Sequence, residues 1–361
     1  MSRLYFLSVF IPVAVALELT DAPATAVFFT SALGLIPTAV LMSDATEHLA
    51  ARSGPGIGGI VNVTFGNAPE LIIAFFALAE GLQEVVKASL VGSVIGNSLL
   101  VLGAAMFAGG WKNGRQTFRR EPAERVATLL LAVCVVLVLP ALAQVTLGEG
   151  GLPQIGELRH HYEGWIEAVS LVVASGLVVY YVIRLTTAIR DRRGIFDVDE
   201  EDLERGEDVW SVRRSVALLA VAGVLVGVMS EVLVGSIEEA SEAIGLSQFF
   251  IGVFVVGIAG NAAEHWVAVV VAIKDKMDLS LNIALGSSVQ IAMFLVPVLV
   301  LASLVVGPDP MALVFNGYEV LALVVAAAIA RFVTHGGHST RNEGALLIGV
   351  YLALGVLFFL A

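Results

Sequence analysis

Long apolar runs separated by short polar stretches dominate this chain. Each run approaches the roughly 20 residues that a helix needs to cross a bilayer, and none alternates as a barrel strand does. Lipid-exposed backbone must satisfy its own hydrogen bonds, so these runs predict helices. We therefore predict an all-α integral membrane protein of about eleven transmembrane helices. The predicted spans are approximately residues 4–18, 25–50, 57–81, 85–110, 124–146, 163–185, 213–237, 247–273, 279–307, 313–334 and 343–361.

The positions of the basic residues support this count. If the N-terminus is cytoplasmic, 18 of the 20 Lys and Arg residues fall on the cytoplasmic side, and only Lys87 and Arg159 fall outside. Cytoplasmic loops carry such an excess of basic residues. We expect a cytoplasmic N-terminus and an external C-terminus. Arg3, the following apolar run and Ala14-Val15-Ala16 also fit a cleaved signal peptide, which would leave ten spans.

Composition narrows the class of protein further. Of the 361 residues, 58% are hydrophobic and 14% are charged, far from the balance of a soluble domain. The net charge of −12 offers no basic face for nucleic acid. The single cysteine, Cys134, excludes an intrachain disulfide. A soluble enzyme, a nucleic-acid-binding protein and a disordered chain are therefore excluded.

Two parts of the chain repeat one another. The motif Gly66-Asn67-Ala68-Pro69-Glu70 recurs 194 positions later as Gly260-Asn261-Ala262-Ala263-Glu264, and Gly92-Ser93 recurs as Gly286-Ser287 at the same offset. Each repeat holds five predicted helices, and an odd number of crossings inverts the second repeat in the membrane, as in many secondary transporters. We expect an N-terminal transmembrane helix at 1–22, a first five-helix repeat at 23–188, a linker at 189–211 and a second five-helix repeat at 212–361.

The linker at 189–211 is the one substantial polar segment, and its centre is strongly acidic. We consider two interpretations of it, a solvated connection and a segment that attracts cations or regulates transport. The chain has no P-loop motif and no long extramembrane domain, which excludes an ATPase module.

Two carboxylates are predicted inside the membrane. Glu70 and Glu264 occupy equivalent positions of the repeats. An ionisable residue at this depth costs several kcal/mol, so its presence there indicates a function. Asn67 and Asn261 precede them by three residues and share their helix faces. Glycines and Pro69 allow the backbone to unwind there. Carboxylate, amide and carbonyl oxygens suit Ca²⁺ or Na⁺ and disfavour zinc or copper. The neighbouring His265 is the one residue here that could also bind a softer metal.

Further polar residues surround this pair in the predicted spans. Helices 85–110 and 279–307 carry hydroxyl and amide groups that either complete a cation shell or pack helices together: Ser93, Asn97, Ser287, Ser288 and Gln290. Four acids flank the site from opposite sides of the membrane, as vestibule acids or as interfacial charges: Asp44, Glu47, Glu238 and Glu239.

The paired Gly-Asn-Ala-x-Glu motifs, the extension to Glu264-His265 and the run Gly286-Ser287-Ser288-Val289-Gln290 resemble the Ca²⁺/H⁺ antiporter (cation/proton exchanger) family of the calcium/cation antiporter superfamily. The resemblance covers essentially the whole chain. It implies that Glu70 and Glu264 bind the cation and protons, with Asn67, Asn261, Ser93, Ser287, Ser288 and Gln290 in support. Pro69 departs from the proton-exchanger pattern and is more typical of Na⁺/Ca²⁺ exchangers. Asn97 matches loosely, because Ile291 occupies its place in the second repeat.

These observations predict an antiporter that exports Ca²⁺ in exchange for H⁺ by alternating access. Two neighbouring carboxylates repel one another, so they bind either protons or a divalent cation, and only the neutralised states reorient. A Na⁺/Ca²⁺ or Na⁺/H⁺ exchanger is the alternative on the same fold, and a cation channel or an intramembrane enzyme are alternatives of other classes. We expect Ca²⁺, protons and bilayer lipid as partners, no cofactor, and a prokaryotic inner membrane as the location. A homo-oligomer is left open.

Overall fold

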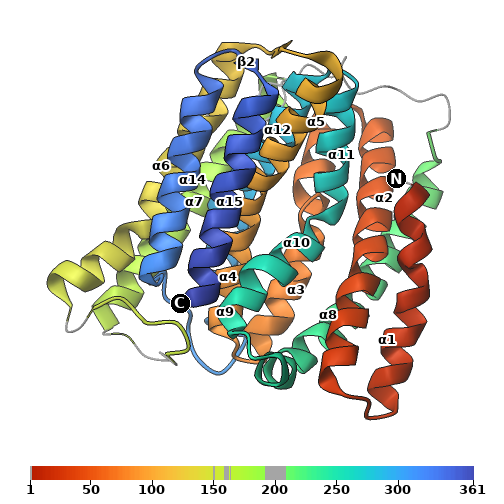
Figure 1. Ribbon diagram of the computed structural model, residues 1–361. Coiled ribbons are helices and arrows are strands. Elements are labelled where there is room, and N and C mark those ends of the chain that lie inside the picture. Colours follow the sequence, from red (N-terminus) through yellow and green to blue (C-terminus); the bar gives the residue numbers. More distant parts are fainter. Residues whose placement is uncertain (1, 149–150, 158–161, 163, 192–208) are drawn as a thin grey trace.

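Helices make up nearly all of the regular structure. The computed structural model describes the chain except for residues 1, 149–150, 158–161, 163 and 192–208 (Figure 1). Within the described residues, eight helices are long and apolar enough to cross a membrane, and the bent pair Gln248–Gly260 and Ala262–Ile273 gives a ninth if it crosses as one span. The predicted all-α membrane class is confirmed. Two more predicted spans fall on shorter apolar helices, Leu4–Leu19 and Ala68–Ala79.

The elements of the first half run from the N-terminus to the acidic segment. They are η1 Ser2–Val9, α1 Phe10–Leu19, α2 Ala24–Phe65, α3 Ala68–Ala79, α4 Gln83–Ile95, the π-helical turn η2 Gly96–Val101, α5 Leu102–Asn113, β1 Gln116–Thr117, α6 Arg120–Leu147 and α7 Gly164–Asp191. Helix α7 therefore includes the first residues of the predicted linker. Most of that linker, 192–208, lies outside the described residues.

The second half repeats this sequence of long, broken and π-bulged helices. Its elements are α8 Val212–Ile244, α9 Gln248–Ile251, the π-helical turn η4 Gly252–Val256, α10 Gly257–Gly260, α11 Ala262–Ile273, α12 Met277–Gln290, the π-helical turn η5 Ile291–Leu295, α13 Val296–Ala302, α14 Gly317–Thr334, β2 His338–Ser339 and α15 Arg341–Leu360. The turns η2 and η5 follow α4 and α12 at equivalent places in the sequence repeat. Such π-bulges occur frequently at functional sites.

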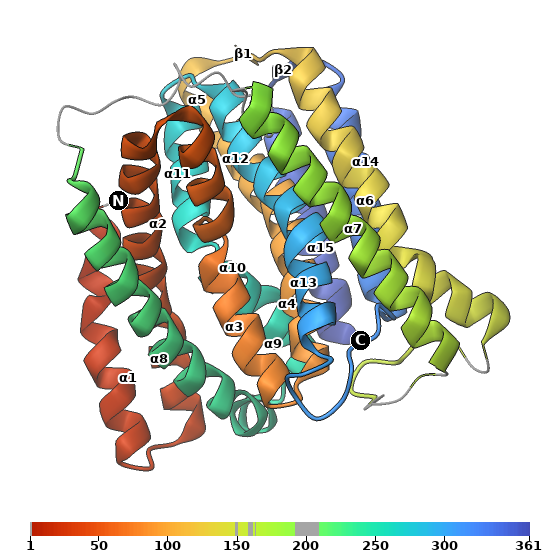
Figure 2. The same cartoon turned by 180° about the vertical axis from the view of Figure 1, so that it is seen from behind.

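The helices form two groups. Helix α2 packs along α8, and α1 packs against both, so these three lie together on one side of the molecule (Figures 1 and 2). The larger group contains α4, α5, α6, α11, α12, α14 and α15, whose mutual contacts enclose most of the core. Helix α3 contacts α8 on one side and α4 on the other, and α10 contacts α2 and α4. The broken helices therefore lie where the two groups meet.

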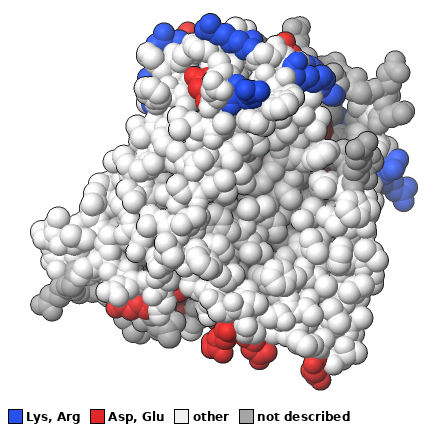
Figure 3. All heavy atoms as spheres, viewed as in Figure 1, with Lys and Arg blue, Asp and Glu red and all other residues white. Residues whose placement is uncertain are grey.

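Charge separates the two ends of the molecule. Figure 3 shows Lys and Arg gathered at one end and Asp and Glu at the other. The basic end holds the short antiparallel sheet, in which Gln116 pairs with Ser339, and it includes Lys112, Arg119, Lys274 and Arg341. The acidic end includes the C-terminal part of α8, which carries Glu238, Glu239 and Glu242. The broad surface between them carries almost no charge in this view, apart from a basic group at its right-hand edge, as expected of a surface that faces lipid.

The predicted span at 57–81 is interrupted near its middle, within the motif where glycines and Pro69 were expected to let the backbone unwind. Helix α2 ends at Phe65 and α3 begins at Ala68, because the chain leaves helical geometry at Asn67 (φ −104°, ψ 24°). Pro69 lies in the first turn of α3, where its missing N–H costs no hydrogen bond. The second repeat breaks at Asn261 (φ −93°, ψ 7°), with a bend of 62°. Hydropathy alone does not detect such a break, since apolar residues lie on both sides of it.

Candidate functional site

The two helix breaks place two glutamates in equivalent positions. Glu70 lies in the first turn of α3, and Glu264 lies in the first turn of α11. The N-terminus of a helix carries a partial positive charge, which favours a nearby carboxylate. Each break therefore both unwinds the chain and creates a place where a buried negative charge costs less.

The two carboxylates lie close to one another. Glu70 is only 6% exposed, and its charge is within the electrostatic influence of Glu264. Glu70 packs against Gly260, where an added Cβ would lie 3.2 Å from Glu70 Cγ. Glu264 is partly exposed, yet its Oε2 is buried. Among the described residues, neither Glu70 Oε2 nor Glu264 Oε2 has a hydrogen-bond partner. Two buried acceptors without donors are suited to bind protons or a cation.

Each motif asparagine contacts the serine of the other repeat. Asn261 Nδ2 donates to Ser93 Oγ at 2.8 Å, and Ser287 Oγ donates to Asn67 Oδ1 at 2.9 Å. Asn67 Nδ2 also donates to Gln290 Oε1 at 2.6 Å. The polar residues of two segments far apart in sequence are thus interleaved around one centre. The repeat pointed to these residues, but it did not show that each asparagine would contact the serine of the other repeat.

Asn97 and His265 complete this network. Asn97, in the π-helical turn η2, donates through Nδ2 to Ser287 Oγ at 3.1 Å and to Asn261 Oδ1 at 3.3 Å. His265 Nε2 lies 3.0 Å from Asn97 Oδ1, an acceptor, which assigns the proton to Nε2. From the sequence, His265 stood only as a residue that fits a purely hard-cation site poorly. Its spacing of four residues from Asn261 was the signal that both share one helix face.

Ser288 is placed differently from the other predicted ligands. Its hydroxyl donates to Ala284 O at 3.0 Å and lies 3.3 Å from Val94 O. Both acceptors are backbone carbonyls, one on its own helix and one on α4. Ser288 therefore links two helices and does not join the amide network.

The four secondary acids lie away from the carboxylate pair, toward the two ends. On α2, Glu47 is exposed, and Asp44 accepts a hydrogen bond from Tyr5 at 2.8 Å. The neighbouring His48 stacks on Trp210 at 4.2 Å, just before α8 begins. Glu238 and Glu239 are exposed near the other end of α8, roughly 40 Å along the helix at 1.5 Å per residue. Asp44 and Glu47 thus lie near one end of the helix pair α2 and α8, and Glu238 and Glu239 lie near the other.

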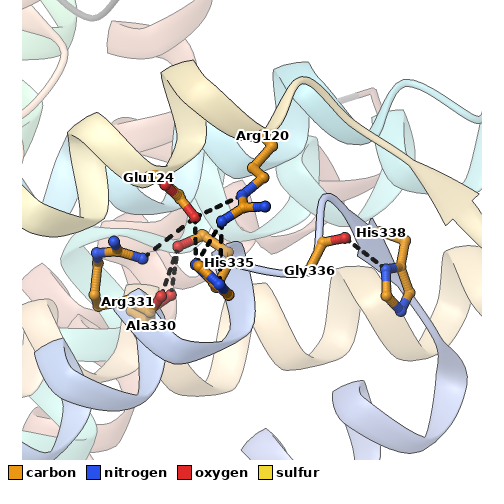
Figure 4. A network of polar contacts seen from close by, with 8 residues as sticks. Arg120, Glu124, Ala330, Arg331, His335, Gly336 and His338 are labelled. Atoms are coloured by element: carbon orange, nitrogen blue, oxygen red, sulfur yellow. Dashed lines mark hydrogen bonds and ion pairs between the residues drawn. The ribbon is translucent and has the colours of Figure 1, made fainter.

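The histidines near β2 do not form a metal site. Glu124 accepts from Arg120 at 2.8 Å and lies 2.6 Å from His335 Nδ1, so this histidine belongs to an ion-pair network between α6 and α14 (Figure 4). His338 Nδ1 instead contacts Gly336 O at 2.7 Å. Within the described part of the chain, no three His, Cys, Asp or Glu side chains gather as a metal cluster. A cation between Glu70 and Glu264 would therefore take its remaining ligands from neutral oxygens.

Broken helices that meet between two helical groups and present buried carboxylates define a secondary transporter. The chain belongs to the sodium/calcium exchanger protein family, whose model matches residues 23–190 and 214–360. It is 38% identical to the Ca(2+)/H(+) antiporter of Aphanothece halophytica, over 98% of this chain and 95% of that protein. It is also 38% identical to the Ca(2+)/H(+) antiporter ChaA of Bacillus subtilis (strain 168), over 100% of both chains.

A solved structure agrees with these relatives. The structure of native YfkE matches with a TM-score of 0.83 at 35% sequence identity, covering 99% of this chain and 100% of that chain. The resemblance to Ca²⁺/H⁺ antiporters inferred from the paired motifs is confirmed, and the chain is a transporter and not an enzyme.

Proposed function

We propose that this protein exchanges Ca²⁺ for H⁺ across a membrane by alternating access. The observation that carries the proposal is the pair of buried carboxylates, Glu70 and Glu264, each with one oxygen that lacks a donor among the described residues. The activity named for the relatives in Aphanothece halophytica and Bacillus subtilis supports the same assignment.

Competition for one pair of charges explains the exchange. When both carboxylates are ionised, they repel one another in a buried site, and either protons or one divalent cation relieves the repulsion. Ca²⁺ takes six to eight oxygen ligands. Glu70 and Glu264 would supply the charged ligands, and the amide and hydroxyl oxygens of Asn67, Asn261 and Ser93 lie in the adjoining network. Water would complete the shell.

Obligatory coupling follows from the cost of moving bare charge. A site with two uncompensated carboxylates cannot cross a low-dielectric barrier cheaply, whereas the protonated and the Ca²⁺-bound sites are both nearly neutral. The site lies where the group of α1, α2 and α8 meets the larger group. We propose that relative movement of these two groups opens the site to each side in turn.

We further propose eleven spans arranged as an N-terminal helix, 1–22, and two inverted repeats, 23–188 and 212–361. The reciprocal contacts of Asn67 with Ser287 and of Asn261 with Ser93 support a two-fold relation between the repeats. On this arrangement the basic end is cytoplasmic, in agreement with the positive-inside rule. The transporter would then export Ca²⁺ while protons enter. The acids Asp44 and Glu47 would face the cytoplasm, and Glu238 and Glu239 would face outward.

The decisive experiment is ⁴⁵Ca²⁺ uptake into proteoliposomes with an imposed gradient of pH or of Na⁺. We expect uptake driven by a pH gradient in the complete absence of Na⁺. Uptake that requires Na⁺ would establish the Na⁺/Ca²⁺ alternative, to which Pro69 points. A unitary current in planar bilayers would establish a channel. Saturation by the counter-ion without such a current is the behaviour of an exchanger.

A further inference from the structure

A second buried charged group lies away from the carboxylate pair, between α4 and α14. Glu84 and Lys87 lie one turn apart on α4, and Glu319 lies in the first turn of α14. We call these three residues the α4–α14 triad. Helix α14 runs from Glu319 toward β2 at the basic end, so the triad lies near the acidic end. Lys87 is one of the two basic residues that do not fall on the predicted cytoplasmic side. Its burial in this triad explains why it departs from the positive-inside rule.

Lys87 is only 9% exposed and donates to Val314 O at 3.0 Å. Its charge and that of Glu84 both act on Glu319. Glu84 Oε1 accepts a hydrogen bond from the backbone of Gly156 at 2.9 Å. Two carboxylates and one ammonium group leave one negative charge without compensation inside the triad.

The helix cap explains only one of the two carboxylate oxygens of Glu319. Its Oε2 accepts from Asn316 N at 2.7 Å, and Asn316 Oδ1 accepts from Glu319 N at 2.8 Å, which together form a capping box. A glutamine would serve this box as well as a glutamate. The second oxygen, Oε1, is buried and has no hydrogen-bond partner among the described residues, although the side chain is only 3% exposed. A buried acceptor left without a donor needs an explanation beyond capping.

The triad borders a pocket that opens at the acidic end. Glu84, Lys87 and Glu319 line it together with Gln83, Glu157 and Asn316. The described titratable groups that face Glu319 are Glu84 and Lys87 from α4, and Glu157 and Tyr162 from the segment before α7. Glu319 is one of the residues that line this pocket, so water in the pocket would lie beside its side chain.

We propose that Glu319 is a second proton-binding site, which takes up protons from the aqueous phase at the acidic end during exchange. This inference rests on the proposed antiport function. A proton from water in the pocket forms one O–H bond at Oε1, and it leaves to water on its way to Glu70 or Glu264. A divalent cation fits this pocket poorly, because it needs six to eight oxygens and would lie beside the ammonium group of Lys87. One proton would neutralise the single excess negative charge of the triad.

The location favours a role in proton entry. From Lys87 to Ser93, helix α4 rises by about 9 Å at 1.5 Å per residue. The same helix thus connects the triad with the network around the carboxylate pair. On the proposed topology the acidic end faces outward, the side from which protons would enter.

The test uses Glu319→Gln in proteoliposomes, with two fluxes measured on the same preparation. The first is ⁴⁵Ca²⁺ transport driven by a pH gradient, with the pH of one compartment varied at a time. The second is exchange of ⁴⁵Ca²⁺ for unlabelled Ca²⁺ at equal pH, which requires no net proton uptake. We expect the proton-driven flux near neutral external pH to fall about tenfold, since a lost proton relay costs at least this much. Acidifying the external side should restore it, and the Ca²⁺ exchange should be unchanged.

Glu343→Gln is the matched control. Glu343 forms the same capping box at the start of α15, where its Oε2 accepts from Thr340 N at 2.8 Å, but it lies at the basic end. We expect both of its fluxes to match those of the unmodified protein. An unchanged response of Glu319→Gln to external pH would overturn the proposal. Equal loss of both fluxes would also overturn it, because that result describes a structural role.

Lys87→Gln provides an independent variant, since the amide keeps a donor for Val314 O and removes the neighbouring positive charge. We expect its proton-driven flux to reach half of its maximum at a higher external pH than in the unmodified protein. No shift, or a shift to lower pH, would contradict a proton on Glu319. If the unmodified protein shows no pH-driven flux, the proposed antiport itself fails, which is a separate result.

Discussion

The chemistry of Glu70 and Glu264 depends on where the helix breaks place them, and not on the residue type alone. Each lies in the first turn of a helix that begins at a break, and each presents one buried oxygen without a donor in the described structure. A glutamine in either position would keep the shape and the helix start. It would lose both the exchangeable proton and the full negative charge.

We therefore expect Glu70→Gln and Glu264→Gln each to abolish proton-driven Ca²⁺ transport. The double variant should be no worse than either single one, as for groups that act as a unit. Glu47→Gln, on the exposed part of α2, should slow transport without eliminating it. The measurement is gradient-driven ⁴⁵Ca²⁺ flux, with folding checked by monodisperse elution in detergent. Substantial coupled flux in well-folded Glu264→Gln protein would exclude a shared two-carboxylate site.

Asn97 and Ser288 offer a comparison between two polar residues near the site. Asn97 contacts Ser287, Asn261 and His265, so Asn97→Ala leaves several buried polar groups unpaired. Such a loss costs about 1–3 kcal/mol, and we expect the Ca²⁺ concentration at half-maximal flux to rise about tenfold or more. Ser288→Ala loses only a bond to backbone carbonyls and should change this concentration by less than about threefold. Equal effects would mean that the network around Asn97 does not position the site.

At the scale of secondary-structure elements, glycine allows α4 to approach the π-helical turn η4 closely. A Cβ at Gly92 would lie 2.2 Å from Val253 O and 2.7 Å from Val253 Cα, both of them backbone atoms that cannot rotate away. On the opposing segment, a Cβ at Gly257 would lie 3.2 Å from Ser89 O and 3.2 Å from Ser93 N, which is a less severe contact. The close spacing of these two segments keeps Ser93 within hydrogen-bond distance of Asn261.

Gly92→Ala should destabilise the protein by about 1–3 kcal/mol, the usual cost of overpacking a core. Gly96→Ala, one turn further along the same chain, is the control, because a Cβ there meets nothing within 4 Å. We expect a lower Tm in detergent for the first variant and an unchanged or higher Tm for the second. A Gly92→Ala protein as stable as its parent would show that α4 and η4 can separate freely.

Over the whole molecule, two helical groups meet around the network of motif residues, and the proposed topology places the basic end in the cytoplasm. Cys134 is the single cysteine of the sequence. In a Cys134→Ala background, an introduced cysteine is therefore the one site that a thiol reagent can label. A cysteine at Val209, before α8, should be labelled only from the cytoplasm. A cysteine at Asp309, between α13 and α14, should be labelled only from outside. Labelling of both from one side would contradict the proposed topology.

The sequence predicted the class of fold and the residues of the motifs, and particular positions show where prediction stopped. The glycines and Pro69 indicated that the span at 57–81 could unwind, and the structure placed the break at Asn67 and made α3 a separate helix. His265 was treated as a reservation, although it hydrogen-bonds into the network through Asn97. Glu319 was not singled out, because its environment comes from α4 and from the segment before α7.

The sequence by itself determined that lipid is the solvent, that helices cross it, and that two motifs repeat at one offset. These properties are local, since run length, hydropathy and identity can be read along the chain. The tertiary structure decided which partners meet: Asn67 contacts Ser287, Asn261 contacts Ser93, and Glu319 lies beside Lys87. Such pairings depend on the packing of helices that are far apart in sequence. No local pattern encodes them, because the same side chains would pair otherwise if the helices packed in another order.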